Sequence, residues 1–217
     1  MSKQPTPFIV IEALDAGGSQ TQTDLLVKRL KKEKHKVFQL HFPQEDRATG
    51  RIIYDKFLLH QNKKPFSLRE RALLFIQDFF SRSEDITAAL DRGQIVVSDR
   101  FCTSTMAYQT IGLKARERRN MIEWIMWLCY QGTPTLPRPQ VTLFLDTPAT
   151  VSLKRLAGKK KDFHENLEKL TKFRNSYVAL AKEQQWQTIL SVTADGRERT
   201  REEIHEEIWQ LVAPLVR

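Results

Sequence analysis

Small residues and two carboxylates directly follow the first apolar run of the chain, residues 8–11. They read Glu12-Ala13-Leu14-Asp15-Ala16-Gly17-Gly18, and a helical pattern of apolar and basic residues begins at Ser19. Small residues let backbone N–H groups approach a phosphate, and the start of a helix presents a partial positive charge to the same anion. The arrangement predicts a phosphate-binding loop; a plain strand-to-helix turn with small residues for packing is the alternative.

The loop departs from the usual phosphate-loop signature, G-x-x-x-x-G-K-[ST]. Ala13 replaces the first glycine, Ser19 replaces the lysine, and Gln20 replaces the hydroxyl residue that binds magnesium. Ser19 therefore removes the ammonium group that usually bridges the β- and γ-phosphates, where positive charge stabilises the transition state. Gln20 can still offer a carbonyl oxygen to a cation, and the hydroxyl of Thr21 could share the metal or phosphate role.

Strand and helix patterns alternate along the chain around this loop. Strand patterns occupy residues 8–11, 37–42, 95–98, 141–146 and 188–192. A first helical pattern begins at residue 19. Further helical patterns cover about 51–59, 68–91, 103–112, 116–130, 148–156, 164–184 and 199–212. Alternation of this kind predicts βαβ units and a parallel sheet covered on both faces. No linker, internal repeat or low-complexity tract interrupts it, so residues 1–217 are expected to form a single domain.

Composition narrows the class of partner and the compartment. The 217 residues carry 35 Lys and Arg against 26 Asp and Glu, a net charge of +9, which favours anionic partners. Two cysteines do not make a disulfide scaffold, and no apolar run is long enough to span a bilayer. We expect a cytoplasmic protein without a membrane partner. Nucleic acid is not an expected partner, because zinc-ligand sets, helix-turn-helix spacing and aromatic-interleaved basic motifs are absent.

Five blocks of sequence occur in a fixed order. They are Glu12-Ala13-Leu14-Asp15 with Gly18, Thr21 and Gln22; Phe42-Pro43 with Gly50; Leu73-Leu74-Phe75 with Asp78; Ser98-Asp99-Arg100-Phe101 with Ser104, Ala107, Tyr108 and Gln109; and Val141 to Asp146 with Pro148, Asp162 and Glu165. In this order they resemble the motifs of the thymidylate kinase family of P-loop nucleoside monophosphate kinases. The resemblance implies a three-layer α/β/α fold, a five-stranded parallel sheet and a helical lid at about 154–165.

The resemblance also implies a reaction, the transfer of the γ-phosphoryl group of ATP to dTMP with Mg²⁺, giving dTDP and ADP. Such transfer depends on alignment of donor and acceptor and on positive charge around the transferring group. The implied catalytic residues are Asp15, Asp99, Arg100, Lys159 and Lys160. Basic lid residues would compensate in part for the lysine missing at position 19; a solvated charged face is the alternative.

The implied binding residues form three sets. The ATP phosphates would contact Ala13, Ala16, Gly17, Gly18, Ser19, Gln20, Thr21 and Arg155. The acceptor dTMP would contact Glu12, Asp15, Phe42, Arg47, Phe75, Arg100, Ser104, Tyr108 and Gln109. Gln20, Thr21 and Asp99 would hold the metal. Alternative roles are a helix cap for Asp99 and a core aromatic for Phe75.

Three expectations stay open. Phe79 stands where the family places the arginine that reads the thymine base, so the base preference is undecided between dTMP and other (deoxy)nucleotides. Replacement of the loop lysine leaves a nucleotide-binding protein with weak or no turnover as an alternative to an active kinase. The family resemblance implies a homodimer, and residues Trp124, Trp127 and Leu128 could form its interface or a core face.

Overall fold

The structure is a computed structural model that describes residues 6–58, 66–157 and 166–216. The predicted catalytic residues Lys159 and Lys160, and most of the predicted lid, lie outside the described residues. No helix among the described residues is long and apolar enough to cross a membrane.

Five parallel strands form one sheet, as predicted. They are β1 (Phe8–Ala13), β2 (Val37–His41), β3 (Ile95–Asp99), β4 (Val141–Asp146) and β5 (Gln187–Leu190), in the order β2-β3-β1-β4-β5. The central strands β1 and β3 are buried along their whole length, which explains their continuous apolar sequence. Because all strands are parallel, their carboxyl ends lie at one edge of the sheet, where ligands of open α/β sheets bind.

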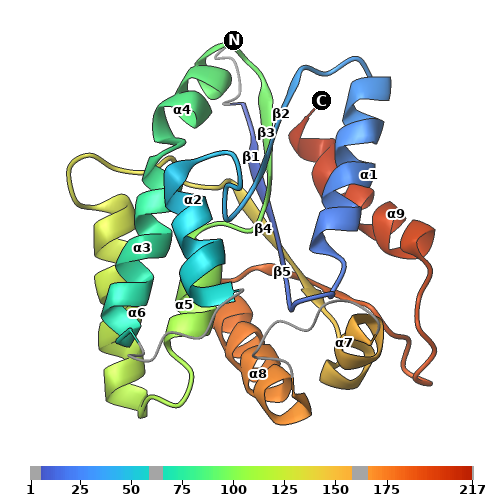
Figure 1. Cartoon of the computed structure of the whole chain (residues 1–217). Helices are drawn as coiled ribbons and strands as arrows, with labels where there is room; N and C mark the ends of the chain where they lie inside the picture. The colour runs from blue at the N-terminus through green and yellow to red at the C-terminus, as the bar shows by residue number, and fades with distance from the viewer. Residues whose placement is uncertain (1–5, 59–65, 158–165, 217) are drawn as a thin grey trace.

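Helices cover both faces of the sheet (Figure 1). They are α1 (Ser19–Lys32), α2 (Ala48–Ile53), a π-helix (Tyr54–Leu58), α3 (Leu68–Phe80), α4 (Ser83–Asp91), α5 (Cys102–Gln109), α6 (Ala115–Tyr130), α7 (Ala149–Leu156), α8 (Leu167–Glu183), α9 (Arg201–Val212) and a 3₁₀ turn (Ala213–Leu215). Helices α1 and α9 pack on one face through a core cluster that includes Leu26 and Ile208. Helices α3, α4, α5, α6 and α8 pack on the other face.

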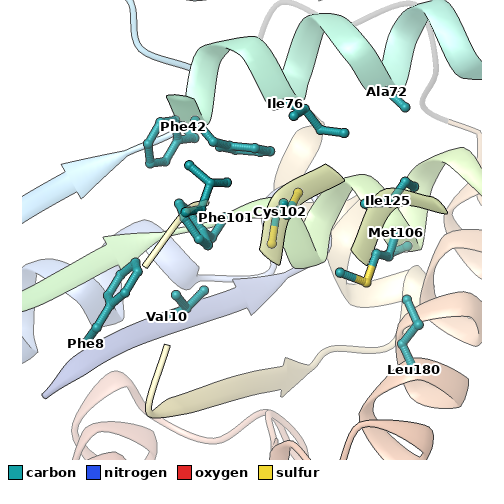
Figure 2. Packing of buried hydrophobic residues seen from close by; sticks show 14 of the residues in the cluster. Phe8, Val10, Phe42, Ala72, Ile76, Phe101, Cys102, Met106, Ile125 and Leu180 are labelled. Carbon is teal, nitrogen blue, oxygen red and sulfur yellow. The ribbon is translucent and has the colours of Figure 1, made fainter. Parts of the chain in front are cut away.

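The larger core cluster joins β1 to α3 and α5. Figure 2 shows Phe8 and Val10 of β1 beneath Phe101 and Cys102, with Ile76 of α3 on the far side. This face of the sheet thereby fixes the start of α5, which carries much of the predicted acceptor site.

Two predicted helices were wrong in extent. The helix predicted over 68–91 is divided into α3 and α4, because the side-chain hydroxyls of Ser81 and Ser83 donate to the carbonyls of Asp78 and Phe80 (2.7 and 2.8 Å) and end the first helix. The helix predicted over 51–59 begins three residues earlier, at Ala48, and changes into a π-helix at Tyr54. The sequence pattern marks the apolar faces correctly but does not reveal these local bonds.

Candidate active site

The ends of three neighbouring strands bring the predicted phosphate loop and acceptor motif together. Asp99 at the end of β3 is paired in register with Ile11 of β1 and with His41 of β2. The loop after β1 and the motif after β3 therefore begin side by side. Arg100 continues this arrangement, since its backbone N–H donates to the carbonyl of Ile11 at 3.0 Å.

The phosphate loop is closed by a tight turn that requires glycine at position 17. The N–H of Gly17 donates to the carbonyl oxygen of Leu14 at 2.8 Å. A Cβ atom on Gly17 would lie 2.8 Å from both that oxygen and the Cβ of Ala13. Ala13, which replaces the first signature glycine, therefore occupies space that is open only because residue 17 has no side chain. Gly18 has φ +106° and precedes the first residue of α1.

Helix α7 holds the same loop from the opposite side. The hydroxyl of Thr147 donates to the carbonyl of Gly17 at 3.0 Å, and the hydroxyl of Ser152 donates to the carbonyl of Asp15. Both hydroxyl residues are fully buried. We did not predict either contact, and no local signal marks them, because small polar residues near the start of a helix are common.

A guanidinium group from α7 lies over the loop where the signature lysine is missing. Nη1 of Arg155 is 3.4 Å from the carbonyl oxygen of Ala16 and 4.0 Å from a Cβ atom built on Gly18. Ser19 is buried at the start of α1, Thr21 is half-buried, and Gln20 is exposed. The loop residues and Arg155 thus lie together as predicted for a phosphate site, whereas the side chain of Gln20 faces solvent.

The acceptor motif forms a cluster around Asp15. Nη2 of Arg100 lies 2.7 Å from the Asp15 carboxylate, and the hydroxyl of Tyr108 donates to the same oxygen at 3.2 Å. Nη1 of Arg100 also donates to the hydroxyls of Tyr108 and Tyr177 at 3.2 and 3.5 Å. Arg100 has φ +67°, and the Ser98 hydroxyl donates to its carbonyl at 2.6 Å. Three predicted residues are therefore brought into one hydrogen-bonded group.

Glu12 is fully buried beneath this cluster and binds the start of α5. Its carboxylate accepts hydrogen bonds from the N–H of Phe101 at 3.1 Å and from the hydroxyls of Thr103 and Ser104. The hydroxyl of Tyr177 of α8 donates to it at 3.0 Å. Burial raises the pKa of Glu12, against the opposing effects of Arg100 and the hydroxyl hydrogen bonds. Glu12 thus positions the start of α5, which carries several of the predicted dTMP-binding residues.

Tyr177 is a site residue that the sequence did not identify. It is fully buried, and its hydroxyl also donates to Ser104 at 3.0 Å. Burial, followed by the charge of Glu12, raises its pKa, and burial raises the pKa of Tyr108. Both phenols therefore remain protonated donors near neutral pH. In the sequence, Tyr177 lies on the apolar stripe of an amphipathic helix and is indistinguishable from a core residue.

Asp99 has one bonded and one free carboxylate oxygen. His41 Nδ1 donates to Oδ2 at 3.0 Å, whereas Oδ1 is buried with no hydrogen-bond partner in the described part of the chain. The described residues contain no group of three or more His, Cys, Asp or Glu that could hold a metal alone. Mg²⁺ characteristically binds one or two protein oxygens together with substrate phosphates. The free Oδ1 beside a phosphate loop fits such an ion.

Other predicted acceptor residues are placed differently. Phe42 is buried in the core, where its ring packs on Phe79 at a centroid distance of 4.9 Å. Arg47 pairs with Asp85 of α4, with 3.0 Å between Nη2 and Oδ2. Phe75 is half-buried on α3 and packs against the larger core cluster. Gln109 is buried on α5, and its Oε1 has no partner among the described residues.

Comparisons with known proteins agree with this geometry. The thymidylate kinase family model matches residues 11–208. A thymidylate kinase of Synechococcus sp. (strain JA-2-3B'a(2-13)) is 34% identical over 208 residues, 95% of this chain and 94% of that protein. A probable thymidylate kinase of Pyrococcus abyssi is 30% identical over 210 residues, 94% and 95% of the two chains.

A solved structure, the thymidylate kinase of Candida albicans, superposes with a TM-score of 0.74 at 20% identity, covering 98% of this chain and 93% of the other. That likeness confirms the predicted P-loop kinase fold. Since the family model spans most of the sequence and relatives at 30% identity or more match it almost end to end, the chain belongs to the thymidylate kinase family.

Proposed function

We propose that this protein transfers the γ-phosphoryl group of ATP to dTMP, giving dTDP and ADP, with Mg²⁺ as the metal. Its family consists of phosphotransferases that act on nucleotides with ATP and a divalent metal. The observation that carries the proposal is the Arg100–Asp15–Tyr108 group, whose shortest contact is 2.7 Å, directly beside a phosphate loop. An acceptor phosphate bound there would face a donor phosphate on the loop.

On the acceptor side, Arg100 would bind the phosphate of dTMP. A guanidinium group offers paired donors that match phosphate oxygens, and burial strengthens such charge-assisted bonds. Asp15 and Tyr108 would orient Arg100 and contact the sugar, while Ser104, Phe75 and Gln109 would line the nucleoside pocket. The unpartnered Oε1 of buried Gln109 supports this role, because such a group is expected to meet a ligand or water.

On the donor side, the N–H groups of the loop and the start of α1 would bind the ATP phosphates, with Arg155 above them. Asp99 Oδ1 and Thr21 would hold the metal directly or through its water. When bound, Mg²⁺ neutralises charge that develops on the phosphate oxygens. His41 fixes the Asp99 carboxylate so that its free oxygen is available to this ion. Gln20, being exposed, is the weaker of the predicted metal residues.

The remaining expectations are part of the same proposal. Residues 1–217 would form one domain that assembles as a cytoplasmic homodimer. Trp127 of α6 and Leu73 of α3 are 53% and 47% exposed on two helices that contact each other, so both would contribute apolar area to an interface there. Sedimentation velocity should give the mass of a dimer; a monomer at micromolar concentration would contradict that part of the proposal.

A coupled assay with ATP, Mg²⁺ and dTMP tests the reaction. We expect ADP and dTDP to form in equal amounts, identified by chromatography, and no product without the metal. The same assay with dUMP and dCMP measures the base preference. This preference is open because buried Phe79 occupies the position of the base-reading arginine. Faster turnover of dUMP or dCMP would overturn the choice of dTMP, and absence of any diphosphate product would overturn the kinase activity.

A further inference from the structure

Because Ser19 replaces the loop lysine, the first turn of α1 has no positively charged side chain for the phosphates of ATP. Ser19 is 6% exposed at the first position of α1, and its short side chain carries no charge. Arg100, the nearest acceptor-side cation, is bound to Asp15, Tyr108 and Tyr177. A second cation must therefore approach the loop if the terminal phosphates of ATP are to be neutralised.

Arg155 is in position to be that cation. It lies in the last turn of α7, and α7 is fixed to the loop by the Ser152 hydrogen bond to the Asp15 carbonyl. Nη1 of Arg155 is 4.0 Å from a Cβ atom built on Gly18, the residue immediately before Ser19. Its hydrogen bond to the loop, 3.4 Å from Nη1 to the carbonyl oxygen of Ala16, is long. A phosphate oxygen would offer this guanidinium a stronger partner than the carbonyl.

Glu198 restrains the guanidinium from its other side. Its Oε2 lies 3.2 Å from Nη2 of Arg155, and its Oε1 lies 3.5 Å from Nζ of Lys154. The backbone of Glu198 is fixed by a bridge to Val192 after β5, and the next N–H, that of Arg199, donates to the Ser191 carbonyl at 2.9 Å. The ion pair with Glu198 therefore restrains Nη2 of Arg155, while Nη1 faces the loop.

We propose that Arg155 performs from α7 the role of the missing loop lysine, neutralising the β- and γ-phosphates of the donor, and that Glu198 is the positioning residue that holds it there; this assignment depends on the function proposed above. Unlike lysine, arginine provides two adjacent donors, one for Glu198 and one for phosphate.

Nucleotide affinity measured by calorimetry tests the assignment separately from turnover. Arg155→Met keeps an unbranched apolar stem and removes the charged guanidinium. We expect it to weaken ATP binding by about 10- to 100-fold, the range for loss of a charged hydrogen-bonding partner. AMP binding should stay within about twofold, because AMP has no β- or γ-phosphate to lose the contact. Lys172→Met, which removes an exposed cation of α8 paired with Glu168, is the control and should leave both affinities within about twofold.

A double-mutant cycle with Ser19→Lys sharpens the test. The lysine should restore most of the ATP affinity lost in Arg155→Met but give little gain beside the native arginine, since both cations would serve one site. Glu198→Gln should reduce the ATP-to-AMP affinity ratio by about three- to tenfold without a change in melting temperature. Equal losses of ATP and AMP affinity, or additive effects of the two substitutions, would overturn the assignment.

The cycle also separates the two proposals. If the wild type forms no dTDP but ATP affinity follows the expected pattern, the kinase function fails and the role of Arg155 stands. If the wild type is an active kinase and Arg155→Met binds ATP normally, the role of Arg155 fails alone.

Discussion

Arg100 and Arg155 both contact the phosphate loop, but they are held in opposite ways. The Arg100 side chain is 16% exposed and has a 2.7 Å ion pair with Asp15. It also donates to the hydroxyls of half-buried Tyr108 and buried Tyr177. The Arg155 side chain is 32% exposed, and its contacts of 3.2 and 3.4 Å are to a carboxylate and one carbonyl. The acceptor side is thus a closed network, whereas the donor side is an open arrangement with a loosely bound cation.

This difference follows from where each residue comes from. Arg100 belongs to a motif next to the sheet, and every partner of its network is buried or half-buried. Arg155 comes from the end of a helix beyond β4 and stands in for a residue that the loop itself lacks. Matched substitutions on the two sides should therefore have unequal effects, largest on the acceptor side.

The largest effect is expected for Arg100→Ala. Loss of one donor that stabilises charge on reacting groups lowers the rate by roughly 10²- to 10³-fold, and we expect a loss of that order in kcat/KM for dTMP. Arg100→Lys should recover part of the loss by keeping the charge. Steady-state kinetics with dTMP varied would measure both, and wild-type values in Arg100→Ala would break the comparison.

Gly17→Ala should have the largest effect on the donor side. The added Cβ would be 2.8 Å from Ala13 Cβ and the Leu14 carbonyl oxygen, and such overpacking costs about 1–3 kcal/mol. Ala13→Gly in the same chain removes one of the two clashes and should recover part of the stability and of the ATP affinity. Urea unfolding and calorimetry measure these changes. Full stability in Gly17→Ala would show that the loop tolerates the methyl group.

Glu12→Gln probes the charge of the acceptor network through pH. Burial raises the pKa of Glu12 above its ordinary value of 4.5, so ionisation is harder in the folded state. The contribution of this group to stability is greatest below pH 4.5 and falls as the pH rises through the folded-state pKa, by at most about 1.4 kcal/mol per pH unit. The stability of the wild type minus that of Glu12→Gln should therefore decrease above pH 4.5. A difference independent of pH would mean that Glu12 has the same pKa in both states.

The smallest effect is expected for Tyr177→Phe. The variant keeps the ring that stacks on Phe144 and removes only the hydroxyl that donates to Glu12 and Ser104. We expect about 1 kcal/mol lower stability and a several-fold higher KM for dTMP. Tyr130→Phe, which removes a hydroxyl bonded to Cys102 instead, is the control. An unchanged KM would place Tyr177 in the core alone.

Most of the fold follows from the sequence, but half of the site does not. Each buried strand appears as a continuous apolar run, and its end is marked by a polar residue such as Asp99, so the layout of the sheet and the position of the loop were predictable. Tyr177 and Ser152 act through contacts between elements far apart in the chain. Their residue types also suit ordinary packing, so only the tertiary arrangement distinguishes them. Arg47 was predicted as an acceptor contact from its position five residues after Phe42, but sequence spacing does not reveal that it pairs with Asp85 of α4.

Asp15 belongs to both sides of the site. Its carbonyl accepts from Ser152 of α7, the helix that carries Arg155, and its carboxylate binds Arg100. If a bound donor displaced α7, the shift would reach the acceptor guanidinium through Asp15. Any resulting coupling would be reciprocal: ATP would alter the affinity for dTMP by the same factor as dTMP alters the affinity for ATP. The shared loop thus links the two proposed substrate sites through one residue, although different atoms of that residue face each side.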